Sequence, residues 1–228
     1  MIKQKILMKQ LLTASVAVTA TLVVSTPVLA EPDSIDSVGG PQCDVVFAVN
    51  DANLNNSQIV FMSGKGTGVE PIGGEYPGYD LEAMDIDAGN VLYVASGDDS
   101  AKPGFLYKVN KATAELTDVG KLCVDEADGI TFNLIDNTLW GWGQDQGIFH
   151  VARGADGELD LASCTIVLPV PEGAPNDEIE DLTWNNDGTI LYGVGNVSDG
   201  DHDSGQDGDK ERVVVAFSPA TGEISQVW

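Results

Sequence analysis

The chain has 228 residues and a formal net charge of −25 at pH 7, with 36 acidic residues against 11 basic ones. A surface this acidic repels nucleic acids and anionic lipids, so the composition excludes both as expected partners. Divalent cations are its natural counter-ions, and external salt would screen its self-repulsion.

The N-terminus has the pattern of an export signal. Three lysines precede an apolar run at 11–24, and a small-residue cleavage pattern ends at Ala30. The run is too short to cross a bilayer. We expect residues 1–30 to be a signal peptide, so that the protein is secreted, periplasmic or on the cell surface, with no membrane insertion after cleavage. Losing three lysines changes the net charge from −25 to −28. An uncleaved membrane anchor is the alternative.

Beyond the signal, the sequence predicts an all-β protein. Residues 31–42 are rich in turn-forming residues, and we expect a flexible leader or a closing strand there. From residue 43 to residue 228, short β-rich runs alternate with turn signals, and no stretch has a convincing helical period.

One unit is written three times, at 80–94, 126–141 and 178–193. Each copy gives an acid, an apolar residue, a second acid, a short strand, a turn and a second strand. Repeats about 50 residues apart indicate stacked supersecondary units, and four antiparallel strands per unit make a propeller blade. We expect four units, the first of which lacks its inner strand: 43–77, 78–124, 125–175 and 176–228.

Three short motifs carry a family resemblance. They are Gly89-Asn90-Val91-Leu92-Tyr93, Leu106-Tyr107-Lys108-Val109-Asn110 and Thr221-Gly222-Glu223-Ile224. They resemble the degenerate repeats of secreted bacterial β-propellers related to the WD-repeat and NHL-like families. The resemblance implies a β-propeller fold and, at most, a binding role, while the repeat count gives about four blades. Either residues 31–42 close a four-bladed ring, or the chain is part of a larger propeller.

The second acids of the three copies are Glu82, Asp128 and Glu180. Strand alternation would put each acid on the same face as the apolar residues two and four positions later, and so into the core-facing row. An inward carboxylate costs several kcal/mol unless it is paired or solvated. Two solutions stay open. The acids accept backbone N–H bonds from a neighbouring blade, or they hold a cation or polar ligand at the mouth of the central channel.

A second candidate site lies in the acidic stretch 199–209. Oxygen ligands alternate there with glycines, as in a calcium loop. The expected ligands are Asp201, Asp203, Asp207 and Asp209. Gly205 falls one place early for an EF-hand, and a solvated insertion is the alternative reading.

The three cysteines are Cys43, Cys123 and Cys164, and an odd count leaves at least one unpaired. Cys123 and Cys164 fall in the last strands of successive units. Because those strands lie on the outer rims of different blades, we expect the two cysteines not to pair. Among the aromatic residues, Trp142 has small counterparts in the other copies, and packing is favoured over a stacking platform.

These patterns favour an exported binding or scaffold module that binds Ca²⁺ or another divalent cation. Its partner would be a small ligand or a surface protein. The alternative is an enzyme, a calcium-dependent propeller hydrolase of the lactonase or phytase type, with Glu82, Asp128 and Glu180 around the metal. The asparagines that such a site usually adds are not evident. A third reading is a structural domain of a larger surface protein.

Overall fold

The structure, a computed structural model, describes residues 45–51, 55–63, 68–170, 178–197 and 211–226, which all belong to one compact unit, Gln42–Trp228. These ranges form sixteen strands and one short 3-10 helix, Leu161–Ser163. None of their helical residues makes a helix that is long and apolar enough for a bilayer.

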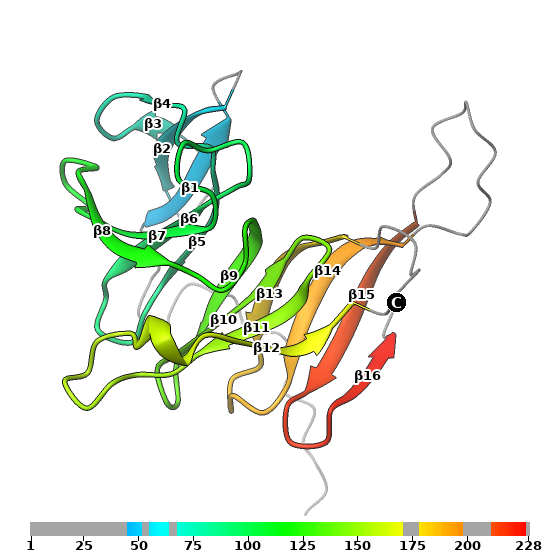
Figure 1. Cartoon of the computed structure of the whole chain (residues 1–228). Helices are drawn as coiled ribbons and strands as arrows, with labels where there is room; N and C mark the ends of the chain where they lie inside the picture. Colours follow the sequence, from blue (N-terminus) through cyan, green and yellow to red (C-terminus); the bar gives the residue numbers. More distant parts are fainter. Residues whose placement is uncertain (1–44, 52–54, 64–67, 171–177, 198–210, 227–228) are drawn as a thin grey trace, which may run out of the picture. The chain divides into compact units, whose positions relative to one another are not determined.

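The strands form four antiparallel sheets that follow one another along the chain (Figure 1). We call these sheets blades 1 to 4. Blade 1 contains β1 (Val45–Asp51), β2 (Asn56–Ser63), β3 (Glu70–Pro71) and β4 (Tyr76–Pro77). Blade 2 contains β5 (Leu81–Ile86), β6 (Leu92–Ser96), β7 (Phe105–Val109) and β8 (Leu116–Lys121). Blade 3 contains β9 (Ala127–Asn133), β10 (Thr138–Gly143), β11 (Gly147–Val151) and β12 (Thr165–Pro169). Blade 4 contains β13 (Glu178–Trp184), β14 (Leu191–Val197), β15 (Glu211–Ser218) and β16 (Glu223–Gln226).

The strands of blades 2 to 4 pair in sequence order, from the first strand to the fourth. All five residues of β6 are buried, because neighbouring blades cover both faces of blade 2. This is why the strand reads as a continuous run of apolar and small residues instead of an alternating one.

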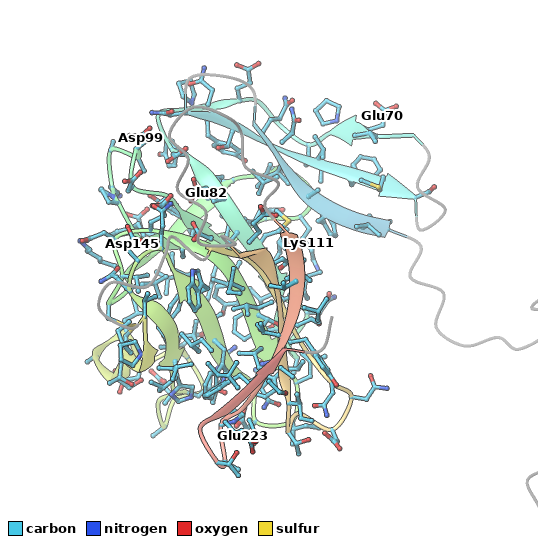
Figure 2. All side chains as sticks on the ribbon, turned by 90° about the vertical axis from the view of Figure 1, so that its right-hand side faces the viewer. Glu70, Glu82, Asp99, Lys111, Asp145 and Glu223 are labelled. Carbon is cyan, nitrogen blue, oxygen red and sulfur yellow. A yellow bond between two sulfur atoms is a disulfide. The ribbon has the colours of Figure 1, made fainter. Side chains whose placement is uncertain are left out.

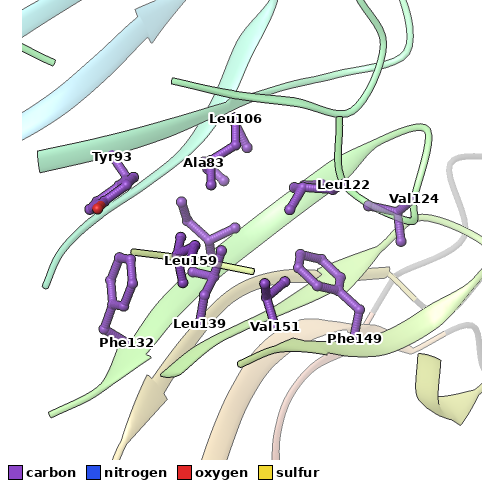
Figure 3. Close-up of a cluster of buried hydrophobic side chains, with 13 residues drawn as sticks. Ala83, Tyr93, Leu106, Leu122, Val124, Phe132, Leu139, Phe149, Val151 and Leu159 are labelled. Carbon is purple, nitrogen blue, oxygen red and sulfur yellow. The ribbon is translucent and has the colours of Figure 1, made fainter. Parts of the chain in front are cut away.

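The hydrophobic core is divided among the blade junctions. One cluster joins blades 1 and 2, a second joins blades 2 and 3, and a third joins blades 3 and 4. In the second cluster, Tyr93 and Leu106 of blade 2 pack against Phe132 and Phe149 of blade 3 (Figure 3). Four four-stranded antiparallel sheets joined face to face are a four-bladed β-propeller arrangement. The predicted fold class is therefore confirmed.

The prediction that the first unit lacks its inner strand is wrong. β1 pairs with β2 over seven residues and lies against β5, the first strand of blade 2. Blade 1 is short at its outer side instead, because β3 and β4 have two residues each and both pair with β2. The sequence analysis did not recognise that the two β-rich runs on either side of the polar stretch after residue 51 pair as one hairpin.

The expectation that Cys123 and Cys164 do not pair is also wrong. They form a disulfide with a Cα–Cα distance of 5.5 Å. Cys123 follows the last strand of blade 2 and Cys164 directly precedes the last strand of blade 3. Blades that pack face to face bring their outer edges within reach of one another, and the sequence argument overlooked this. Cys43 lies outside the described residues.

Candidate metal centre

Blades 2, 3 and 4 each carry a β-bulge in the first strand, at the repeated acid. In blade 2, Leu81 pairs with Ser96 and Ala83 pairs with Ala95, which leaves Glu82 as the extra residue. The same skip in the pairing leaves Asp128 as the extra residue in β9 and Glu180 in β13. A bulge re-aims the side chain of its extra residue and locally increases the twist of the strand.

The bulges overturn the expected side-chain phase. Leu81 and Met84 are three residues apart, yet both belong to the core between blades 1 and 2. Ala127 and Ile130 likewise share the core between blades 2 and 3. The apolar row therefore steps over the acid, and Glu82 keeps an exposed side chain. Strict alternation could not reveal this, because an inserted residue shifts the phase by one.

Three carboxylates from blades 2 and 3 converge at this point. One oxygen from each of Glu82, Glu126 and Asp128 lies within 4.8 Å of the other two. Glu82 comes from the bulge of β5, Asp128 from the bulge of β9, and Glu126 from the residue just before β9. We call these three residues the carboxylate cluster. The described residues thus bring together two of the three predicted acids, while Glu126 stands where Glu180 was expected.

More acids surround the cluster. Figure 2 shows Asp99 and Asp145 on the same side of the molecule as Glu82, whereas Glu223 lies at a different end. Asp80 precedes β5, and its Oδ2 accepts a hydrogen bond of 3.2 Å from the backbone N–H of Asp99. The cluster therefore lies in a field of negative charge, to which the segment before β5 and the loops between the second and third strands of blades 2 and 3 contribute.

Gly97 lets the acids approach the backbone. A Cβ atom at this position would lie 2.5 Å from Cδ of Glu82 and 2.6 Å from Oδ2 of Asp80. Both distances are far below van der Waals contact, so any larger residue must displace the two carboxyl groups. The absence of a side chain here is a requirement of the acidic site itself.

Loss of hydration, together with neighbouring charges, raises the pKa values of the two glutamates. Although solvent reaches the Glu82 side chain, the protein atoms packed around its carboxyl group remove part of its hydration, which raises its pKa to about 8, and nearby carboxylates, Glu126 first, add to the effect. Burial likewise raises the pKa of Glu126 to about 7, with Asp98 next among the causes, although a hydrogen bond with Glu82 opposes the rise. The two groups interact, so they titrate as a pair around neutral pH.

The geometry suits a hard cation. Ca²⁺ binds oxygen ligands at 2.3–2.6 Å, so two oxygens on one ion can be at most about 5 Å apart. The 4.8 Å limit within the cluster meets that condition. A divalent ion would also remove the mutual repulsion of the carboxylates, because it supplies the positive charge that the group lacks.

A different acid forms the link between blades that the sequence had suggested. Asp85 of β5 accepts a hydrogen bond of 2.6 Å from the backbone N–H of Phe132 in β9, and one of 2.7 Å from its neighbour Ile86. Burial raises the pKa of Asp85, while these hydrogen bonds favour its charged form. Asp85 thus makes a backbone link between blades 2 and 3, a role for which the sequence gave no signal.

A pocket lies at the other end of the same first strands. Its volume is about 230 Å³, and residues of blades 2, 3 and 4 line it, among them Asp85, Thr131, Phe132, Thr183, Trp184 and Asn186. Leu134 and Ile135, on the turn after β9, contribute apolar side chains that are 62% and 69% exposed. The mixed lining can accept a small organic ligand, and sequence analysis did not identify it.

The proposed calcium loop cannot be placed. Asp201, Asp203, Asp207 and Asp209 lie outside the described residues. Trp142, by contrast, is 9% exposed and belongs to the core between blades 3 and 4, so the packing role favoured for it is confirmed.

Comparison with known proteins agrees with the fold alone. No family model and no curated protein matches the chain. A Bacteroides thetaiotaomicron protein of unknown function is similar in structure, with 15% identity and a TM-score of 0.52, over 81% of this chain and 44% of that one. A Lactobacillus plantarum protein matches with 14% identity and a TM-score of 0.50, over 81% of this chain and 53% of that one. A chain of a nidogen/laminin complex matches with 13% identity and a TM-score of 0.51, over 81% and 60%. This chain spans about half the length of these proteins.

Proposed function

We propose that this chain is an exported binding module that holds a divalent cation, Ca²⁺ by preference, at Glu82, Glu126 and Asp128. The observation that carries the proposal is the convergence of three carboxylate oxygens within 4.8 Å, from two adjacent blades. A sequence with 36 acidic residues and a predicted export signal favours a calcium-rich exterior as the place of action. The Cys123–Cys164 disulfide supports the same location. The partner would be a small ligand or a surface protein.

A calcium titration of melting temperature tests the metal. Binding to the native state alone stabilises it by about 2.7 kcal/mol when the free ion reaches 100 times its Kd. For a chain of this size that corresponds to a rise of roughly 5–10 °C. We expect this rise in the wild-type protein and a loss of most of it in Glu82→Gln and Asp128→Asn.

Glu180→Gln is the matched control, because Glu180 occupies the equivalent bulge of blade 4 and does not belong to the cluster. It should respond to Ca²⁺ like the wild type. Gly97→Ala should weaken the response by displacing the carboxyl groups, whereas Gly74→Ala, where an added Cβ meets nothing within 4 Å, should not. An unchanged response in Glu82→Gln would refute this site. A loss confined to Asp203→Asn would move the metal to the acidic loop.

A second candidate function is hydrolysis at the same cluster. In this role the three carboxylates would hold Ca²⁺, which would polarise the bond to be hydrolysed and activate a bound water. Calcium-dependent turnover of lactones or phosphate esters that Glu126→Gln abolishes would support the enzyme. A calcium response with no turnover on such a panel would favour the binding module.

A further inference from the structure

The blade junctions use one repeated row of positions in the second strand. In β6, Tyr93 and Ala95 are 1% and 0% exposed, and both belong to the core that faces blade 3. At the matching positions of β10, Trp140 and Trp142 pack into the core that faces blade 4. This row is thus the surface with which a blade meets the next blade along the chain.

Blade 4 repeats the row without such a cover. Gly193 identifies the face of blade 4 that packs against blade 3, because an added Cβ there would lie 2.9 Å from Ile179 of that core. Tyr192 and Val194, the neighbours of Gly193 in β14, therefore point to the opposite face. Val194 is 41% exposed and Tyr192 is only partly buried. Across the sheet they pair with Ala216 and Val214, which are also partly buried. Among the described residues, this apolar face is therefore partly exposed and has no buried cluster over it.

Blade 1 has the complementary open face. Phe47 and Ile59 turn toward blade 2 and join the core there. The alternate residues of the same two strands form apolar cross-strand pairs on the other face, Val46 with Met62 and Ala48 with Val60. Val46 is 44% exposed and Ala48 and Met62 are partly exposed, whereas Val60 is 7% exposed. Among the described residues, the buried clusters join blades 1 and 2, 2 and 3, and 3 and 4, and none joins blade 4 to blade 1.

We propose that the open face of blade 4 packs against the open face of blade 1 of a second copy of this chain, and the reverse, so that two copies complete one eight-bladed propeller. The contact continues the packing already used at three junctions, with the same row of apolar positions. It is head-to-tail, and two such contacts related by a two-fold axis close the assembly. Eight blades lie within the range that propellers adopt.

A second copy suits these faces better than an unrelated partner. Each face is one half of a junction whose other half this chain also carries, at its opposite end. The paired residues on both faces are uncharged, which keeps the carboxylates of this strongly acidic chain out of the contact. Long-range repulsion between two acidic copies remains, so association should be stronger in salt than without it.

Light scattering after size exclusion tests the proposal on the purified protein. The buffer contains about 0.5 M NaCl, because salt at this concentration shortens the Debye length to a few Å. We expect the wild type at twice the mass of a single chain. Val194→Lys and Val46→Lys should each run at half the wild-type mass. Val167→Lys is the matched control, because Val167 is 42% exposed and lies on the fourth strand of blade 3; it should stay dimeric.

Mixing the two monomeric variants tests the head-to-tail geometry and guards against misfolding. Val46→Lys keeps blade 4 intact and Val194→Lys keeps blade 1 intact, so the mixture should recover a dimeric fraction that neither variant shows alone. A monomeric wild type would overturn the proposal, whether the ring closes within one chain or another segment covers the faces. A dimer sensitive to only one of the two variants would overturn it as well, since it would mean that like faces pair.

Discussion

Glu82 and Glu126 define the behaviour of the site at the scale of single residues. Both are glutamates whose pKa values the fold raises, to about 8 and about 7, by burial and by repulsion between carboxylates. Their charged forms are therefore less favourable in the folded chain than in the unfolded one. This energetic cost is what a bound cation would remove.

The raised pKa values predict a loss of stability as the pH rises. Between the unfolded pKa of 4.5 and the folded values of about 7 and about 8, the native state binds more protons than the unfolded state. The free energy of unfolding must then fall as the pH rises through this window. We expect the melting temperature in EDTA to fall from pH 5 to pH 8.5, with a shallower fall in Glu82→Gln.

Glu180→Gln should keep the wild-type slope, because its carboxyl group does not belong to the cluster. A rise in melting temperature over the same pH range in the wild type would contradict the assignment.

The sequence located the site only in part. Repetition identified Glu82 and Asp128, and both belong to the cluster. Treating the three copies as equivalent suggested Glu180 as the third member. The third member is instead Glu126, the residue before β9, so all three carboxylates come from blades 2 and 3. The signal was available, since Glu126 is the first acid of its copy. What the sequence could not supply is the distance between side chains of different blades.

At the scale of elements, the outer edges of blades 2 and 3 are joined covalently. The Cys123–Cys164 bridge links chain positions 41 residues apart. A cross-link of this kind stabilises mainly by reducing the freedom of the unfolded chain. Its position at a junction means that it restrains two blades at once.

Reducing the bridge should lower stability by about 2–4 kcal/mol, which corresponds to a melting temperature lower by roughly 5–15 °C in a chain of this size. Dithiothreitol during calorimetry provides the measurement. Cys123→Ser with Cys164→Ser should match the reduced wild type and show no further change with the reductant. Equal melting temperatures with and without dithiothreitol would show that the bridge contributes no stability.

The elements also mark where sequence patterns stop being informative. The turn residues and β-rich runs predicted four strands correctly in the second, third and fourth units, because those signals are local. The bulges at Glu82, Asp128 and Glu180 were missed, since a single inserted residue leaves no mark in composition. The position of β1 was also missed, because a strand's place in its blade depends on which strands it pairs with and contacts, and the local sequence does not show this.

At the scale of the whole molecule, the dominant feature is charge. The full chain carries a net charge of −25, and the expected exported form carries three positive charges fewer. Only a few carboxylates of the described residues have a cationic partner, as in the buried pair of Arg153 and Asp87 at 2.7 Å. Repulsion among the remaining acids opposes folding, and screening should relieve it.

We therefore expect the melting temperature to rise by several degrees as NaCl increases from about 10 mM to about 1 M, over which the Debye length falls from roughly 30 Å to 3 Å. Glu180→Gln and Glu82→Gln, which each remove one negative charge, should start higher and rise less. Millimolar CaCl₂ should exceed the effect of NaCl at equal ionic strength if the metal site is present. A melting temperature that falls steadily with NaCl would refute this account.

The bulges have one more consequence. The strand register steps over the extra residue of each bulge, so exchanging its side chain should have little effect on the register of the sheet. Substitutions at positions 82, 128 and 180 can thus change the side-chain chemistry of a blade while its sheet stays the same. Copies of an ancestral blade with such a bulge could diversify in reactivity without a change of fold.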